Sequence, residues 1–298
     1  MRKFSSLAAA SLLTGLLAVS AVHAAESADT VIPEHQQWSF AGVYGHYDKG
    51  QLQRGFKVFK EVCSQCHQAS QLVFRNLDEE GGPEFSKAQV AALAATFQVQ
   101  DGPNDAGDMF KRPGRPSDNY PWNFANENAA KAALGALPPD MSELAKARTV
   151  EYGFPWFLIE ALPFFVNEEQ GPDYIYALLT KGYVDPPKGA EPVPNGFYYN
   201  AVIQGTQHRI KMPNPLAALF NADGSPQDPK FYTDGTVMTQ DQVARDVSAF
   251  LMWAAEPKLE ERKKFGFRVM TFLVVLAGLL YFVKKKVWAG LKDESPAV

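Results

Sequence analysis

The stretch Cys63-Ser64-Gln65-Cys66-His67 decides how this 298-residue chain is organised. Cys-x-x-Cys-His is the attachment signature of a c-type haem. Two thiols about one helical turn apart can reach the two vinyl groups of a haem, and the next residue can present its imidazole to the iron. Cys63 and Cys66 are the only cysteines in the chain, so attachment would consume both thiols. We therefore expect one covalent haem c, with His67 as an iron ligand.

Two cysteines at this spacing also occur in sites other than haem-attachment sites. A thioredoxin-like redox pair opens a helix after a strand, whereas this motif closes a predicted helix over residues 51–66. The apolar residues of that helix recur at helical spacing, at Leu52, Phe56, Phe59 and Val62. A local disulfide is a second alternative. A zinc site with four ligands is disfavoured, because the chain has two cysteines and five histidines.

The rest of the pattern indicates the fold class. Helical patterns cover residues 86–95, 127–134 and 238–255, whereas alternating strand patterns are scarce. Residues 101–123 and 185–215 are rich in Pro, Gly, Asn and aromatic residues. Long irregular stretches argue against a compact domain unless something internal organises them, and a buried haem would do so. We predict an all-α, cytochrome c-like haem domain with long irregular loops.

The two ends of the chain predict its compartment. Arg2 and Lys3 precede an apolar run that closes with Val22-His23-Ala24, which is typical of a secretory signal peptide over residues 1–24. Residues 265–283 are apolar except for Arg268, and three lysines follow, so residues 262–286 are predicted to be a transmembrane anchor. Residues 25–261 then form one exported domain, and residues 287–298 form a short cytoplasmic tail.

The predicted exported domain is strongly acidic. The whole chain has 33 acidic and 29 basic residues. Two basic residues fall in residues 1–24, and eight basic and two acidic residues follow residue 261, which leaves 31 acidic against 19 basic residues in between. The resulting formal charge of −12 repels nucleic acid and favours a basic protein partner, although it also serves solubility alone.

The second axial ligand of the iron must come from a distant part of the chain. Met212 stands out among the loop methionines because Pro213 and Pro215 stiffen its loop. A His/Met pair raises the reduction potential. His208 is the rival, and it would give a bis-histidine haem of low potential. The residues alone leave both open.

At this point the chain resembles a known family, cytochrome c1, the haem subunit of the quinol–cytochrome c oxidoreductase (bc1) complex. The resemblance covers about residues 36–286, and its segments run in the family's order. They include Arg54-Gly55-Phe56 before the haem motif, Val99-Gln100-Asp101-Gly102-Pro103-Asn104, Met109-Phe110-x-Arg112-Pro113-Gly114, Gly135-Ala136-Leu137-Pro138-Pro139-Asp140 and Trp253-Ala254-Ala255-Glu256-Pro257.

The resemblance implies roles for four further residues. Met212 matches the family's sixth ligand, and Arg148 matches an arginine that pairs with a haem propionate. Pro138 and Pro139 fall where the family packs a loop against the haem. The chain departs from the family at Leu134, where an Asn-rich stretch is usual, and residues 154–170 look like an aromatic insertion. Some bacterial members have an extra disulfide in this region, but this chain has no cysteines there that could form it.

The expected function is that of a one-electron carrier in the respiratory bc1 complex. The resemblance implies that electrons come from the Rieske iron–sulfur protein and go to cytochrome c. It implies that quinol is oxidised on cytochrome b, not on this chain, and that the complex is dimeric. We expect a single-pass protein of the cell inner membrane, with its haem domain in the periplasm. Two alternatives stay open: a free-standing membrane cytochrome that serves another reductase, and a haem enzyme with an open coordination site.

Overall fold

The structure is a computed structural model that describes residues 31–148, 170–203 and 206–292, with side chains described as far as residue 289. The predicted signal peptide, almost all of the aromatic insertion and the last residues of the tail lie outside this described part. Its helices and 3-10 turns, in chain order, are α2 (Lys49–Glu61), η2 (Cys63–Gln65), η3 (Phe74–Asp78), α3 (Lys87–Ala95), α4 (Glu127–Leu134), α5 (Leu144–Ala147), α7 (Gln170–Thr180), η4 (Pro215–Ala218), α8 (Gln240–Ala255) and α9 (Leu259–Lys292).

Helix ends are set by capping side chains that the sequence displays. The Ser86 hydroxyl and the Gln89 side chain form a reciprocal capping box at the start of α3. The Asn126 side chain caps α4 by accepting from the Ala129 amide, and Gly135 ends this helix in the left-handed conformation. The Thr239 hydroxyl accepts from the Gln242 amide at the start of α8. The helices predicted at 86–95, 127–134 and 238–255 are therefore confirmed to within two residues.

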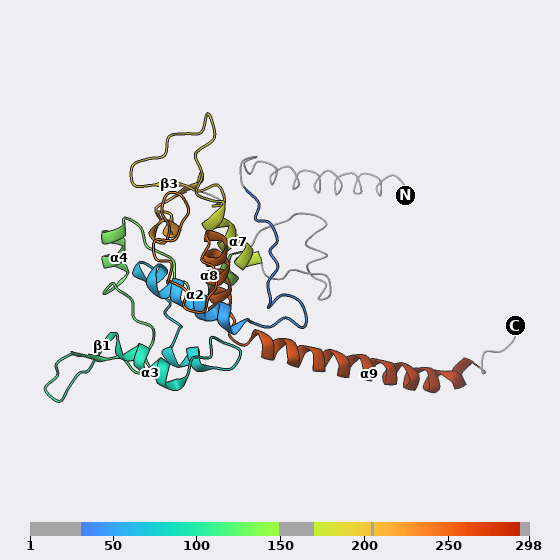
Figure 1. The fold of residues 1–298 in the computed structure, drawn as a ribbon. Helices are drawn as coiled ribbons and strands as arrows, with labels where there is room; N and C mark the ends of the chain where they lie inside the picture. Colours follow the sequence, from blue (N-terminus) through green and yellow to red (C-terminus); the bar gives the residue numbers. More distant parts are fainter. Residues whose placement is uncertain (1–30, 149–169, 204–205, 293–298) are drawn as a thin grey trace, which may run out of the picture.

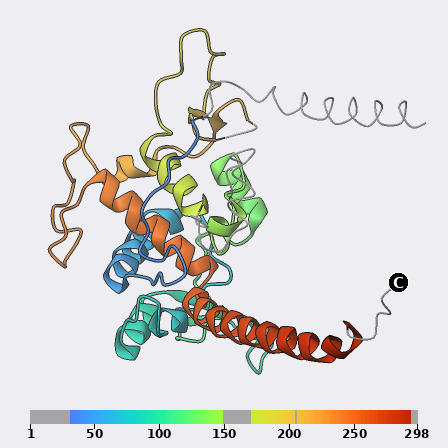
Figure 2. The same cartoon turned by 90° about the vertical axis from the view of Figure 1, so that its right-hand side faces the viewer.

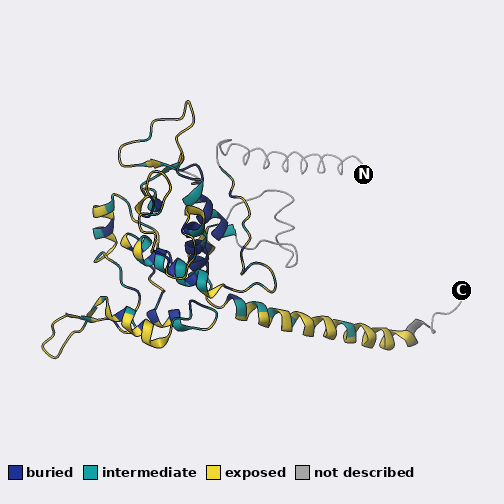
Figure 3. Ribbon diagram, in the orientation of Figure 1, coloured by how far each residue is buried: buried dark blue, intermediate teal, exposed yellow. Residues whose placement is uncertain are grey.

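The core lies where α2 crosses α8, with α7 packed on the other side of α8 (Figures 1 and 3). Gly55 makes the close crossing of α2 and α8 feasible, because a Cβ there would lie 2.0 Å from the backbone oxygen of Asp246. The fully buried Asp246 carboxylate accepts two hydrogen bonds from Arg54, at 2.9 and 3.2 Å. Buried aromatic side chains fill the space around this crossing, among them Phe56, Phe59, Phe250 and Trp253.

The all-α prediction is wrong in one respect, because two small antiparallel sheets are present. Strand β1 (Gln98–Asp101) pairs with β2 (Phe110–Pro113), and β3 (Tyr198–Tyr199) pairs with β4 (Arg209–Ile210). The β1–β2 hairpin projects from the domain (Figure 1). Its strands lack the apolar alternation by which a strand can be predicted. They are held together by a polar contact instead, because the Arg112 guanidinium pairs with Asp101 across the hairpin and also with Asp118.

Helix α9 leaves the domain as one long projecting helix (Figures 1 and 2). It contains a span from Leu259 to Ala289 that is long and apolar enough to cross a membrane. None of the most apolar part of this span is buried by the rest of the chain (Figure 3). Helix α9 begins at Leu259, and only a three-residue corner separates it from the end of α8 at Ala255. The chain is thus a helix-rich domain with a C-terminal membrane anchor.

Candidate haem-attachment site

The haem motif lies in a tight turn at the end of α2. The predicted helix over residues 51–66 ends earlier, at Glu61, and the chain continues as the 3-10 turn η2. The Ser64 hydroxyl donates to the Lys60 carbonyl at 2.7 Å, and the His67 amide donates to the Cys63 carbonyl at 2.9 Å. This turn places the two cysteines and the histidine next to one another on a short segment.

His67 is oriented by the segment that contains the two prolines. Its Nδ1 lies 2.8 Å from the Pro139 carbonyl oxygen. Because a carbonyl can only accept, Nδ1 carries the proton and donates, and the Nε2 lone pair is left to bind a metal. Burial lowers the pKa of His67, which keeps the ring neutral near pH 7. A neutral imidazole fixed at Nδ1 is the form that ligates iron.

The two cysteines are free thiols that the fold does not activate. Burial, reinforced by the neighbouring Cys66, raises the pKa of the Cys63 thiol to about 12, and burial also raises the pKa of the Cys66 thiol. A thioredoxin-like redox pair needs a lowered thiol pKa, so this environment argues against that alternative. No group of three or more His, Cys, Asp or Glu side chains forms a metal site within the described ranges, and the zinc alternative finds no support there.

A segment that the sequence analysis did not single out also holds the motif. The Trp122 indole donates to the Cys66 carbonyl at 2.9 Å, and the Asn123 amide donates to the Ser64 carbonyl at 3.1 Å. The Tyr120 ring is buried against Phe59, and its hydroxyl lies 3.4 Å from that of Ser64. The run of aromatic and Asn residues after Pro121 is the feature of the sequence that could have indicated this segment. Its contacts with the haem motif could not be predicted from spacing, because more than 50 residues separate the partners.

Met212 lies on a half-buried loop that hydrogen bonds restrain. The Tyr183 hydroxyl lies 3.1 Å from the Met212 carbonyl oxygen and 3.3 Å from that of Pro213. The Asn214 side chain accepts from the Leu216 amide and starts η4. The neighbouring Lys211 ammonium lies 3.7 Å from where a Cβ of Gly135 would be. The methionine loop therefore approaches the same Gly135–Pro139 segment that binds His67, although no described contact joins His67 to Met212.

His208, the rival ligand, lies at a tight turn in the β3–β4 hairpin, where its φ is +59°. Its ring packs on Tyr199 with 5.6 Å between the centroids, and its carbonyl accepts from the Asn200 amide. Its Nδ1 is buried and has no hydrogen-bond partner. The contact with Tyr199 places the His208 ring against its own hairpin.

The remaining predicted residues lie around the same region. Arg148 ends α5, and its side chain is exposed. Burial raises the pKa of Tyr174 on α7, and the positive charge of Arg148 offsets part of this shift. Pro138 is half-buried beside Pro139. No described residue forms an ion pair with Arg148, so its predicted pairing with a propionate stays a prediction.

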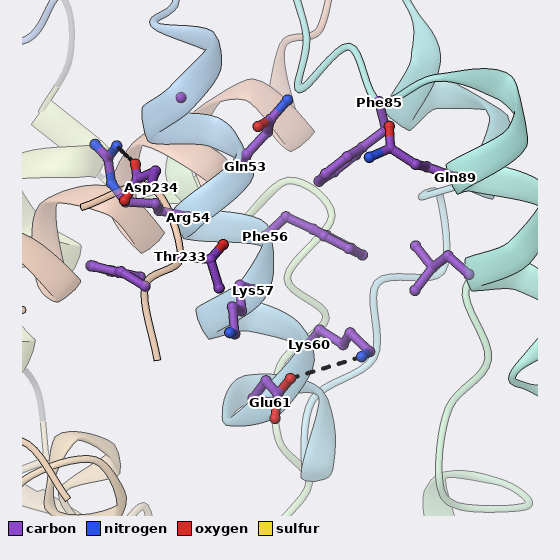
Figure 4. Close-up of a pocket in the computed structure, with 13 residues that line it drawn as sticks. Gln53, Arg54, Phe56, Lys57, Lys60, Glu61, Phe85, Gln89, Thr233 and Asp234 are labelled. Carbon is purple, nitrogen blue, oxygen red and sulfur yellow. Dashed lines mark hydrogen bonds and ion pairs between the residues drawn. The ribbon is translucent and has the colours of Figure 1, made fainter. Parts of the chain in front are cut away.

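A separate cavity of about 450 Å³ lies between α2, α3 and residues 232–234 (Figure 4). None of the predicted haem residues lines it. Its charged side chains are engaged by neighbours: Arg54 pairs with Asp234 at 2.7 Å, and the Lys57 ammonium donates to the Phe231 carbonyl. We assign no ligand to it.

Comparison with known proteins decides the family. The sequence model of the Cytochrome C1 family matches residues 38–291. The chain belongs to the cytochrome c1 family. Cytochrome c1 of Blastochloris viridis is 44% identical over 292 residues, which cover 97% of this chain and 98% of the relative. Cytochrome c1 of Rhodospirillum rubrum is 42% identical, with 86% of this chain and 88% of the relative covered.

One relative is much longer than this chain. A protein of Bradyrhizobium diazoefficiens named cytochrome b/c1 is 52% identical over 259 residues, which cover 86% of this chain but only 36% of that protein. Members of the cytochrome c1 family are haem-bearing electron-transfer subunits of bc1 complexes and carry one covalent c-type haem. The predicted family, cofactor and electron-transfer function are thereby confirmed.

The described residues fit such a haem. Two free thiols flank a turn that begins at the end of α2, and the next residue presents a neutral imidazole whose Nδ1 is already bonded. Cys63 and Cys66 would hold the vinyl groups, and His67 would ligate the iron.

Proposed function

We propose that this chain takes one electron at a time from a Rieske iron–sulfur protein and passes it to a cytochrome c. The observation that carries the proposal is the hydrogen bond from His67 Nδ1 to the Pro139 carbonyl, beside two unactivated thiols. When bound, the haem supplies a one-electron redox centre. Cys63, Cys66 and His67 would fix its position; the Trp122 indole restrains Cys66, and the Pro139 carbonyl restrains His67.

We propose Met212 as the sixth ligand. Its loop is restrained by the Tyr183 hydroxyl, and Pro213 limits its backbone freedom. A thioether on the iron raises the potential and closes the iron to small molecules, as an electron carrier requires. Arg148 is proposed to pair with a propionate, since a guanidinium fork matches a carboxylate.

Both ends of the chain support a placement in the membrane. We propose that residues 1–24 are removed after export, that residues 25–261 form the periplasmic haem domain and that residues 262–286 anchor it in the cell inner membrane. Lys284, Lys285 and Lys286 favour a cytoplasmic tail over residues 287–298.

The proposed partners are cytochrome b, the Rieske protein and an acceptor cytochrome c, in a dimeric complex. The name cytochrome b/c1 of the Bradyrhizobium relative supports an association with cytochrome b. Quinol oxidation is then assigned to cytochrome b, and none is assigned to this chain.

Purification of the full chain from its native membrane in mild detergent, with absorption spectra of the eluate, tests this proposal. We expect b-type haems and a Rieske protein to co-purify with the covalent haem of this chain. Recovery of the c-type haem alone would favour the free-standing cytochrome instead.

A further inference from the structure

A cavity of about 620 Å³ lies where the haem domain meets the membrane anchor. Three segments line it: residues 43–49, residues 80–84 and the first turns of α9, from Glu260 to Arg268. A volume of this size is typical of sites for small organic ligands. The cavity is separate from the haem motif, and no residue proposed for electron transfer lines it.

The cavity contains charges of both signs at different depths. Arg268 and Glu80 line it, and neither forms an ion pair with a described residue. Other charges are paired: Lys49 with Glu84 at 3.3 Å, and Lys264 with Glu260 at 3.5 Å. A Cβ on Gly81 would lie 3.8 Å from the Glu260 carboxyl group, so Glu80 lies near the level of Glu260.

Arg268 lies deeper along the anchor than the carboxylates. It follows Glu260 by eight residues, or about 12 Å at 1.5 Å per helical residue. Lys264 lies one turn above Arg268 on the same face of α9. Arg268, and Lys264 one turn above it, therefore lie towards the membrane end of the cavity, whereas Glu80 lies towards the domain end.

Aromatic side chains mark the same level of α9 as a membrane interface. Tyr44 is 81% exposed, and its ring lies 6.0 Å from that of Phe267, which is 51% exposed. An exposed Tyr beside a membrane span is typical of the headgroup layer. From Phe265 onward, large apolar side chains of α9 are exposed on all sides.

We propose that this cavity binds the headgroup of a zwitterionic glycerophospholipid of the outer leaflet. Lys264 and Arg268 bind its phosphate, Glu80 faces its ammonium group, and the acyl chains run along α9 beside Phe267. The order of charges along the anchor matches this headgroup: phosphate near the hydrocarbon, ammonium outside it. An anionic headgroup without an ammonium would leave Glu80 unmatched and bring negative charge towards Glu84 and Glu260.

The test measures lipid binding to the haem-loaded full chain in mild detergent by native mass spectrometry. The probes are phosphatidylethanolamine, phosphatidylglycerol and inorganic phosphate. We expect phosphatidylethanolamine to bind more tightly than phosphatidylglycerol. The double variant Lys264→Gln with Arg268→Gln should weaken this binding by about tenfold or more, the loss expected when a charged hydrogen bond to the phosphate is removed. Glu80→Gln should shift the preference towards phosphatidylglycerol.

The matched control is the double variant Lys284→Gln with Lys285→Gln, which also removes two positive charges but at the other end of α9. It should change phosphatidylethanolamine binding less than about twofold, because a zwitterionic lipid has no net charge for a basic cluster to attract. Equal losses in both double variants, a preference for phosphatidylglycerol, or full competition by inorganic phosphate would each overturn the proposal. So would phosphatidylethanolamine binding that is unchanged in the Lys264/Arg268 variant.

Discussion

His67 is oriented by a backbone carbonyl from a distant segment of the chain. The Pro139 carbonyl fixes its tautomer, and burial lowers its pKa, so the ring is held neutral with Nε2 free to coordinate. The same burial raises the pKa of the Cys63 thiol. The site thus suits covalent attachment followed by axial ligation, and does not suit thiol redox chemistry.

Replacing Met212 by leucine tests the sixth ligand. Loss of the thioether should lower the midpoint potential by on the order of 100 mV or more, within the range of about 0.8 V that axial ligands span. It should also open the iron, so that the reduced protein binds carbon monoxide rapidly. Redox titration and carbon monoxide difference spectra measure both effects.

Met109→Leu is the matched control, because Met109 is a loop methionine that is 55% exposed. It should leave the potential and the spectrum unchanged. If Met212→Leu behaves like this control, Met212 is not the ligand, and His208 becomes the first candidate for replacement.

The residues that would attach the haem could be predicted from the sequence, whereas the residues that hold the haem motif in place could not. Cys63, Cys66 and His67 follow from a spacing, and family resemblance added Pro139, although as a packing residue. Its carbonyl in fact bonds to His67. Trp122 and Asn123 bond to backbone carbonyls of the motif, and such contacts depend on how loops fold in space.

At the scale of elements, an ion pair between half-buried Arg54 and fully buried Asp246 bridges α2 and α8. Replacing Arg54 by alanine would leave the fully buried Asp246 carboxylate without its cationic partner, with the Gln242 amide still donating to it. We expect the free energy of unfolding to fall by about 3–5 kcal/mol. Urea unfolding of the haem-loaded protein, followed by circular dichroism, measures the change.

Lys60→Ala on the same helix provides the control, since the Lys60–Glu61 pair is exposed and 3.8 Å apart. Its effect should stay within about 1 kcal/mol. Equal effects of the two substitutions would show that the buried pair does not stabilise the crossing.

Helices with caps and apolar spacing were predictable, and elements held by polar or distant contacts were not. The N-cap residues Ser86 and Thr239 predict where α3 and α8 begin. The β1–β2 hairpin depends on Arg112 meeting Asp101 and Asp118, which no local pattern displays. Helix α7 was missed although Asp173 lies in its first turn; this buried carboxylate accepts from the Trp38 indole at 2.7 Å, a partner 135 residues away.

At the scale of the whole molecule, the predicted exported domain carries a formal charge of −12 on residues 25–261. Such a field favours a basic acceptor. Within the acidic run from Asp78 to Glu80, however, Glu79 pairs with Lys258 at 3.7 Å and Glu80 lines the cavity beside α9. The acceptor should therefore dock on other acidic parts of the domain. One further acidic pair of the sequence, Glu168-Glu169, lies outside the described residues.

Electron transfer to a basic cytochrome c should depend steeply on salt. We expect the second-order rate constant to fall by about tenfold or more between roughly 0.01 and 1 M ionic strength, as the screening length shrinks from about 30 to 3 Å. Stopped-flow oxidation of the reduced haem measures this rate. An acceptor with acetylated lysines should lose most of the salt dependence, and a rate that is independent of salt with the unmodified acceptor would contradict electrostatic docking.

The central claim is that this chain receives electrons from the Rieske protein and not directly from quinol. The most direct test is the rate at which its c-type haem is reduced when quinol is added to the purified membrane complex, before and after the Rieske protein is extracted. We predict rapid reduction in the complete complex, loss of that reduction after extraction and its return when the Rieske protein is added back. Equally fast reduction without the Rieske protein would contradict the account.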